Sequence, residues 1–175
     1  MIKSLIKNIF AKIYGESYDI YLLRKSGVKI GKNFYYDNSY IDGSFRYLVE
    51  IGDNVTFTHA TILAHDASTK IPLGKSKIGR VTIGNNVFIG YGTIILPNVT
   101  IGSNVVIGAG SIVNRNIPDN SVAAGNPCKV LGDYDTFVSK NKALMSSHPV
   151  YTSEDAVSSK DQIAKALGNT FGYID

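Results

Sequence analysis

The chain of 175 residues contains no tryptophan, one cysteine and three histidines. A single thiol, Cys128, cannot form a disulfide within the chain, so a disulfide-stabilised scaffold is excluded and a reducing compartment is favoured. The sequence lacks an apolar run near the roughly 20 residues of a membrane-spanning helix. Its amino terminus lacks the apolar stretch and cleavage site of a signal peptide. These absences predict a cytoplasmic protein.

Acidic residues are scarce near the amino terminus, where the net charge of +4 originates. Residues 1–32 carry seven Lys or Arg against two acidic residues, which leaves the rest of the chain close to neutral. No basic segment interleaved with aromatic residues, as RNA-binding modules have, is present. Nucleic acid is therefore not an expected partner.

The apolar residues of the segment 2–14 follow the i, i+3, i+4, i+7 rule, which predicts an amphipathic helix ending at Gly15. Lysines occupy its polar face. Two interpretations stay open. The helix caps one end of the core, or it lies on a membrane surface near lipid-linked substrates.

An apolar residue recurs every six positions in the middle of the chain. The positions are Ile51, Phe57, Leu63, Ile83, Ile89, Ile95, Ile101, Ile107 and Val113. A period of six fits neither an α-helix nor plain strand alternation, but it fits a short strand followed by a corner. Three such sides make one coil of a triangular prism, and each coil pairs with its neighbours. The 17 glycines of the chain suit its many corners.

This repeat predicts an all-β fold, a parallel β-helix, within a chain of three parts. Residues 1–27 form an amino-terminal helical cap, residues 28–132 the β-helix domain, and residues 133–175 a carboxy-terminal tail with a helix. In the tail, Ser159 with Gln162 predicts a capping box, and Gly168 predicts the helix end.

The one clear interruption of the repeat is the segment 66–80, which we expect to project from the prism as a loop. It contains Lys70, Lys75, Lys77 and Arg80, with no acidic residue after Asp66. Basic residues beside a site favour an anionic ligand, and Lys70 is the one we expect to contact substrate. A solvated loop is the alternative interpretation of the same charges.

His65 directly precedes this loop and falls at a corner of its coil. An imidazole that titrates near neutral pH suits removal of a proton from a hydroxyl, so His65 is the expected general base. Asp66 could orient the imidazole, although an adjacent side chain often points the wrong way. Shaping the loop or contacting substrate is the alternative role for Asp66.

His59 stands six residues before His65, which raises the question of a metal site. Zinc needs at least three convergent ligands, and residues six apart lie on adjacent sides of a prism. His148 is far away in the tail. We therefore expect no metal, and His59 either contacts the acceptor or has a surface or packing role.

The run "IGNNVFIGYGTIILPNVTIGSNVVIGAGSIVNRNIPDNSVAAGNPCKVL" resembles the hexapeptide-repeat acyltransferases with a left-handed β-helix. The resemblance covers roughly residues 28–132. The ending from Gly108 to Val130 is similar to the branch of galactoside, maltose, serine and xenobiotic acetyltransferases and of sugar O-acetyltransferases from surface-polysaccharide loci. The "HDAST" around His65 most resembles the last group.

The resemblance implies a homotrimer that binds acetyl-CoA as co-substrate, without metal, at active sites between subunits. By position, it implies CoA contacts from Gly90, Tyr91, Ala109, Asn114, Arg115, Pro127 and Lys129. An amide near Tyr91 would meet the thioester carbonyl. Asn114, where the family often has Thr, departs mildly from this pattern. Gly132 stands where some relatives have a further Arg, so the resemblance implies one phosphate contact fewer here.

The function expected is acetyl-CoA-dependent O-acetylation of a sugar hydroxyl, in a bacterial surface polysaccharide or its precursor. Serine O-acetylation, N-acetylation of an amino sugar and acetylation of a xenobiotic remain alternatives. A non-catalytic β-helix scaffold is the alternative from another class, but it needs neither His65 nor the interrupting loop.

Overall fold

The structure, a computed structural model, describes residues 15–175, and the helix expected over residues 2–14 lies outside this range. The chain divides into two compact units. The first ends at Tyr134 and the second spans Asp135–Asp175.

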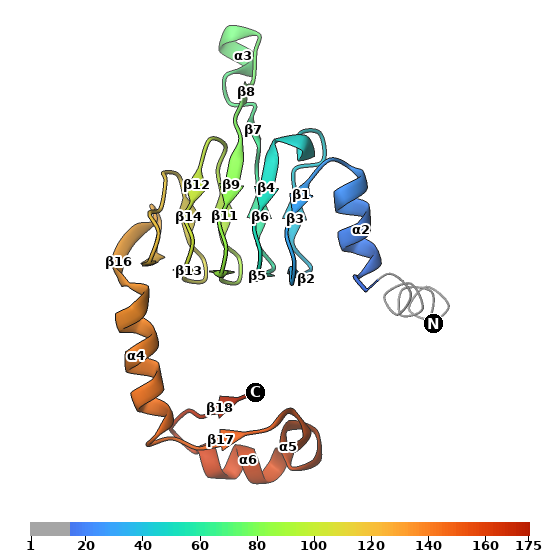
Figure 1. Cartoon of the computed structure of the whole chain (residues 1–175). Helices are drawn as coiled ribbons and strands as arrows, with labels where there is room; N and C mark the ends of the chain where they lie inside the picture. The colour runs from blue at the N-terminus through green and yellow to red at the C-terminus, as the bar shows by residue number, and fades with distance from the viewer. Residues whose placement is uncertain (1–14) are drawn as a thin grey trace. The chain divides into compact units, whose positions relative to one another are not determined.

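The first unit is a parallel β-helix with three sheets (Figure 1). Sheet A contains β1 (Lys29–Ile30), β4 (Val49–Ile51), β9 (Val81–Ile83) and β12 (Thr100–Ile101). Sheet B contains β2 (Tyr35–Asp37), β5 (Val55–Thr58), β10 (Val87–Ile89), β13 (Val105–Ile107), β15 (Ser121–Ala124) and β16 (Lys129–Asp133). Sheet C contains β3 (Tyr40–Ile41), β6 (Thr61–Ile62), β11 (Ile94–Ile95) and β14 (Ile112–Val113).

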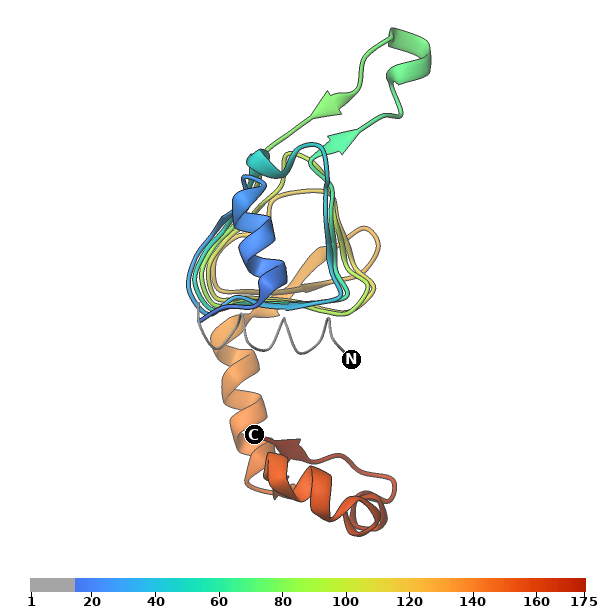
Figure 2. The same ribbon diagram turned by 90° about the vertical axis from the view of Figure 1, so that its right-hand side faces the viewer.

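Successive coils stack in register, so the view along the prism in Figure 2 shows a roughly triangular outline. Side-chain hydrogen bonds between equivalent asparagines join residues 21, 32 and 18 positions apart. The 18-residue circuit is the regular one that the sequence predicts. The 32-residue circuit includes the projecting segment, which leaves the prism at one corner (Figure 2). This segment, the arm, contains β7 (His65–Asp66), α3 (Lys70–Leu73) and β8 (Lys77–Ile78).

The interior of the prism is filled by the residues of the six-residue repeat. Eight of the nine predicted positions are at most 4% exposed. The prediction for Leu63 is wrong, because Ile62 takes the inward position and pairs with Ile95. The preceding corner is one residue shorter than in the next coil. His59 turns the chain with a φ of 48°, where the next coil uses Tyr91 followed by Gly92 at 69°.

The corner between sheets A and B carries a ladder of asparagines. Asn33, Asn54, Asn86 and Asn104 all have positive φ between 52° and 56°. The side-chain amide nitrogens of Asn33, Asn54 and Asn86 each donate to the side-chain oxygen of the asparagine in the next coil at 2.9 Å. Asparagine tolerates the left-handed conformation better than other side chains, and here its amide also ties neighbouring coils together.

The two ends of the prism are covered differently. At the start, α2 (Tyr18–Lys25) buries Ile20 and Leu23 against the core, and Ser17 caps its first turn. Between β3 and β4 lies a short 3-10 helix, η1 (Arg46–Leu48). At the other end, β16 folds back antiparallel on β15.

The second unit contains three helices and a two-stranded parallel sheet. α4 (Tyr134–Met145) leads into β17 (Val150–Tyr151), α5 (Ser153–Ser158), α6 (Lys160–Leu167) and β18 (Tyr173–Ile174). The expected helix ends at Gly168. The capping box is not at Ser159, whose side chain makes no capping bond, but at Thr152 and Asp155 of α5. Within residues 15–175, no helix has both the length and the apolar character needed to cross a bilayer.

Asn86 offers a direct test of the ladder, because it is exposed and bonds to both neighbouring coils. Asn86→Gly keeps the left-handed backbone but loses two hydrogen bonds, so we expect its free energy of unfolding to be about 1 kcal/mol lower than that of the wild type. Asn86→Ala adds left-handed strain of about 1–2 kcal/mol. Urea unfolding should therefore rank the wild type first, the glycine variant second and the alanine variant last. An alanine variant as stable as the glycine variant would contradict this account.

Candidate active site

His65 stands where the chain leaves the prism for the arm. Strand β6 ends at Ile62, Ala64 is fully buried, and the next residue begins β7. The side chain of His65 is 35% exposed. A rigid coil therefore holds the backbone of this histidine while its ring reaches solvent.

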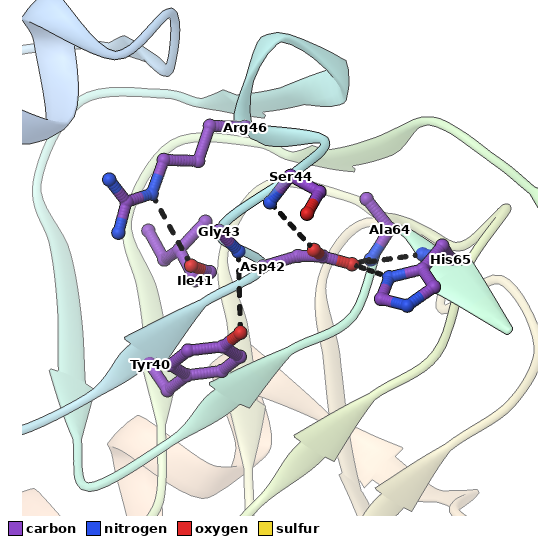
Figure 3. Close-up of polar contacts among 8 residues, drawn as sticks. All are labelled: Tyr40, Ile41, Asp42, Gly43, Ser44, Arg46, Ala64 and His65. Atoms are coloured by element: carbon purple, nitrogen blue, oxygen red, sulfur yellow. Dashed lines mark hydrogen bonds and ion pairs between the residues drawn. The ribbon is translucent and has the colours of Figure 1, made fainter. Parts of the chain in front are cut away.

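Asp42 is the partner of His65, and it comes from the preceding coil (Figure 3). Its Oδ2 contacts Nδ1 of His65 in a short hydrogen bond, and the same oxygen accepts the backbone N–H groups of Ala64 and His65, both at 3.1 Å. Its Oδ1 accepts the N–H of Ser44 at 3.2 Å. Asp42 is 1% exposed, so a buried carboxylate holds the imidazole from one side.

The protonation of this pair follows from its environment. Burial alone would raise the pKa of Asp42, but hydrogen bonds from His65, Ala64 and Ser44 and the charge of His65 outweigh burial and lower it. The carboxylate is thus ionised at neutral pH and can only accept hydrogen bonds. Nδ1 of His65 must then carry the proton, which leaves Nε2 of the neutral ring with a free lone pair.

The turn that carries Asp42 is itself fixed. The hydroxyl of Tyr40 accepts the N–H of Gly43 at 3.3 Å, and Nε of Arg46 donates to the carbonyl of Ile41 at 3.5 Å (Figure 3). The N–H of Asp42 is paired with Ile62 at 2.9 Å. The carboxylate that holds His65 is therefore positioned by hydrogen bonds of its own coil and of the next.

Asp66, the partner expected from the sequence, faces a different group. Its Oδ1 accepts the N–H of Ser68 at 2.8 Å, which closes the turn into the arm. This backbone hydrogen bond is the main reason why the pKa of Asp66 is lowered. The role of orienting His65 through Nδ1 falls in this structure to Asp42, which the sequence reasoning missed. Its signal was the "YIDG" of the earlier coil, which a 21-residue circuit places beside residue 63.

His59 lies at the opposite end of the strands of sheet C, at the corner between sheets B and C. Its ring packs on Tyr91 with centroids 4.6 Å apart, and its Nε2 lies 3.6 Å from Oδ2 of Asp37. Tyr91 is 62% exposed. Among the described residues, no group of three or more His, Cys, Asp or Glu side chains could hold a metal ion.

Gly90, Tyr91 and Ala109 lie together at this same corner in successive coils. The N–H of Gly90 donates to Ile107 at 2.9 Å, so it is engaged within the prism. A Cβ on Gly90 would lie 2.6 Å from the amide nitrogen of Ala109, so only glycine fits. The carbonyl of Tyr91 accepts the N–H of Gly110 at 2.8 Å.

Asn114 and Arg115 instead follow sheet C at its His65 end. Asn114 lines a cavity of about 400 Å³ between the base of the arm and the coil corners. The other lining residues are Asp66, Lys77, Ile78, Leu96, Pro97 and Asn98. Pro127 and Lys129 are exposed at the last turn, where the N–H of Cys128 donates to Ile112. Lys70 is exposed in α3 of the arm.

Comparison with known proteins agrees with the repeat. The family model for the bacterial transferase hexapeptide (six repeats) matches residues 80–115. Protein CapG of Staphylococcus aureus is 40% identical over 143 residues, which are 77% of this chain and 83% of CapG. Galactoside O-acetyltransferase of Escherichia coli K12 is 41% identical over 138 residues, covering 74% of this chain and 66% of the relative.

A solved structure of a galactoside acetyltransferase in complex with coenzyme A matches with a TM-score of 0.53 and 35% identity. The match covers 65% of this chain and 68% of that one. The chain therefore belongs to the hexapeptide-repeat acetyltransferases and is an enzyme of this class, which confirms the resemblance. The solved relatives imply a left-handed sense for its coil.

The His65–Asp42 pair predicts a pH dependence of folding. A carboxylate with a lowered pKa stabilises the folded state above its unfolded value of about 3.9, and this stability is lost as the pH falls through the lower folded pKa. Asn at position 42 cannot ionise. The free energy of unfolding of Asp42→Asn should thus fall less steeply than that of the wild type between about pH 5 and about pH 3, roughly one unit either side of the unfolded value. The free energies are measured by urea titration at each pH. Equal slopes against pH for the wild type and Asp42→Asn would contradict a lowered pKa for Asp42.

Proposed function

We propose that this enzyme transfers an acetyl group from acetyl-CoA to a hydroxyl of a sugar in a bacterial surface polysaccharide or its precursor. The observation that carries the proposal is the His65–Asp42 pair at the base of the arm. The similarity to galactoside O-acetyltransferase supports both the acetyl donor and a sugar acceptor.

His65 acts as the general base. A sugar hydroxyl is a poor nucleophile while protonated, and Nε2 of His65 removes its proton as the oxygen attacks the thioester carbonyl. Positive charge then develops on the imidazole, 35% exposed, and the buried carboxylate of Asp42 stabilises it. When the C–S bond breaks, the proton on Nε2 passes to the sulfur of CoA.

The oxyanion of the tetrahedral intermediate, which forms when the hydroxyl oxygen attacks the thioester carbonyl, needs a hydrogen-bond donor. Because the N–H of Gly90 is engaged with Ile107, we assign this contact to the N–H of Tyr91. Tyr91 and His65 lie at opposite ends of the strands of sheet C. This separation within one chain supports an active site between copies of a homotrimer, with His65 from one copy and Tyr91 from the next.

The residues assigned to CoA also lie at the two ends of the strands of sheet C and at the last turn of the β-helix. Ala109 continues the corner of Tyr91 by one coil and suits the pantetheine. Asn114 and Arg115 lie at the His65 end, where the cavity of about 400 Å³ opens, and Arg115 supplies a cation for a phosphate. Pro127 and Lys129, exposed at the last turn, are assigned to the adenine and its phosphate.

The acceptor contacts are assigned to His59 and to the arm. The His59 ring, packed on Tyr91 beside Asp37, presents an aromatic face and hydrogen-bonding groups, which suits the apolar face and hydroxyls of a sugar ring. Lys70 of the arm is assigned to an anionic group of the acceptor or its carrier. Asp66 is assigned to the shape of the arm through Ser68.

The division of roles between the two aspartates predicts an order of activities. Substituting His65→Ala should lower kcat by about 10²–10⁴-fold, because the general base is lost. Asp42→Asn should lower kcat by at least about tenfold, because the imidazolium loses its counter-charge. The matched control Asp66→Asn should leave kcat within about threefold, since its carboxylate binds Ser68 instead. Thiol release from acetyl-CoA, measured over a panel of methyl glycosides, checks all three.

The product should gain about 42 Da, the mass of one acetyl group, on an oxygen of the glycoside. Unchanged thiol release by His65→Ala with an accepted glycoside would refute the mechanism, because the reaction would then proceed without His65 as the base. A greater loss of kcat in Asp66→Asn than in Asp42→Asn would show that Asp66, and not Asp42, supports His65 in the reaction.

A further inference from the structure

Phe45 packs against the ring of the proposed base, and neither sequence pattern nor family position singles it out. It lies in the turn between Asp42 and η1, half-buried at the edge of the core. Its ring centroid is 5.1 Å from that of His65, with the planes tilted by 41°. One short turn therefore supplies two contacts to the same imidazole, a hydrogen bond and an aromatic face.

The two contacts restrict different motions. The hydrogen bond from Nδ1 to Asp42 fixes the direction of the imidazole within its own plane. It leaves the ring free to tilt about that bond, because a carboxylate oxygen accepts hydrogen bonds over a broad range of directions. Phe45 blocks the tilt on one side, since close-packed ring atoms cannot interpenetrate. Together the two contacts restrict the orientation of the ring, and with it the direction in which Nε2 points.

Phe45 is itself held in place. The N–H of Leu48 donates to the carbonyl of Phe45 at 2.9 Å, and the Phe45 side chain packs against the buried core. The N–H of Ser44 is bound by Asp42 at 3.2 Å. A flexible side chain in this place would not restrict the imidazole, whereas a half-buried ring on a braced turn does.

The geometry points to Phe45 as a positioning residue, which clamps the face of the His65 ring so that Nε2 meets the acceptor hydroxyl in a single orientation. This role rests on the proposed function of His65 as the base. Misplacement of a reacting group by about 1 Å can cost on the order of a hundredfold in rate. The clamp thus acts on kcat, through His65, and not on the binding of acetyl-CoA.

The first test measures the clamp without any acetyl transfer. Diethyl pyrocarbonate modifies the free nitrogen of a neutral imidazole, and peptide mass spectrometry gives a separate rate for each of the three histidines. In folded Phe45→Ala, we expect His65 to react at least about threefold faster, because its ring gains exposure and freedom. The rates at His59 and His148, which pack on Tyr91 and Phe171, should not change.

Three further variants make the result specific. Phe45→Tyr keeps the ring and should restore the slow rate at His65. Phe45→Leu keeps apolar bulk without a flat face, should fold like the wild type, and should give an intermediate rate. Tyr47→Leu is the matched control, because it removes the exposed aromatic residue of the same turn without touching His65, and it should leave the His65 rate unchanged.

The second test uses turnover with methyl β-D-galactopyranoside as the acceptor probe. Phe45→Ala should lower kcat by about tenfold or more and leave the KM for acetyl-CoA within about twofold. If this glycoside is not acetylated, the proposed acceptor fails while the modification rates still decide the clamp. An unchanged His65 rate in both Phe45→Ala and Phe45→Leu overturns the proposal. Equal acceleration of all three histidines also overturns it, because that is the signature of general loosening.

Discussion

The hydrogen bond between Nδ1 of His65 and the buried carboxylate of Asp42 joins two successive coils at the corner where the arm leaves. An ionised carboxylate with 1% exposure costs free energy unless its oxygens are bonded. The surrounding turns meet this requirement with the N–H groups of Ser44, Ala64 and His65. The same bonds that make the buried charge tolerable also fix the imidazole, so local stability and the proposed chemistry depend on one contact.

The stacking of coils explains why this contact can form at all. Equivalent corners lie directly above one another, so a residue 23 positions away in sequence becomes a neighbour in space. Two successive coils carry extra residues at the same corner, the turn from Asp42 to η1 and then the arm. The regular coils beyond them, tied by their asparagines, form the rigid base from which both insertions project.

The sequence predicts the prism because an apolar residue every six positions has no other simple structural interpretation, and eight of nine such positions are buried. It also predicts His65 at a corner beside the arm. The repeat could not reveal the shortened corner at His59, which moves the inward position from Leu63 to Ile62. Asp42 and Phe45 were missed because the coil that carries them is irregular, and only its stacking on the next coil brings them to His65.

Asp42 holds His65 with the proton of the neutral ring on Nδ1 and the free lone pair on Nε2. Nitrogen-15 NMR of histidine-labelled protein, recorded where the ring is neutral, tests it most directly. For His65 we expect a protonated Nδ1 and an unprotonated Nε2, with loss of this preference in Asp42→Asn. A neutral His65 ring that carries its proton on Nε2 in the wild type would contradict the account, because such a ring offers the acceptor hydroxyl no base.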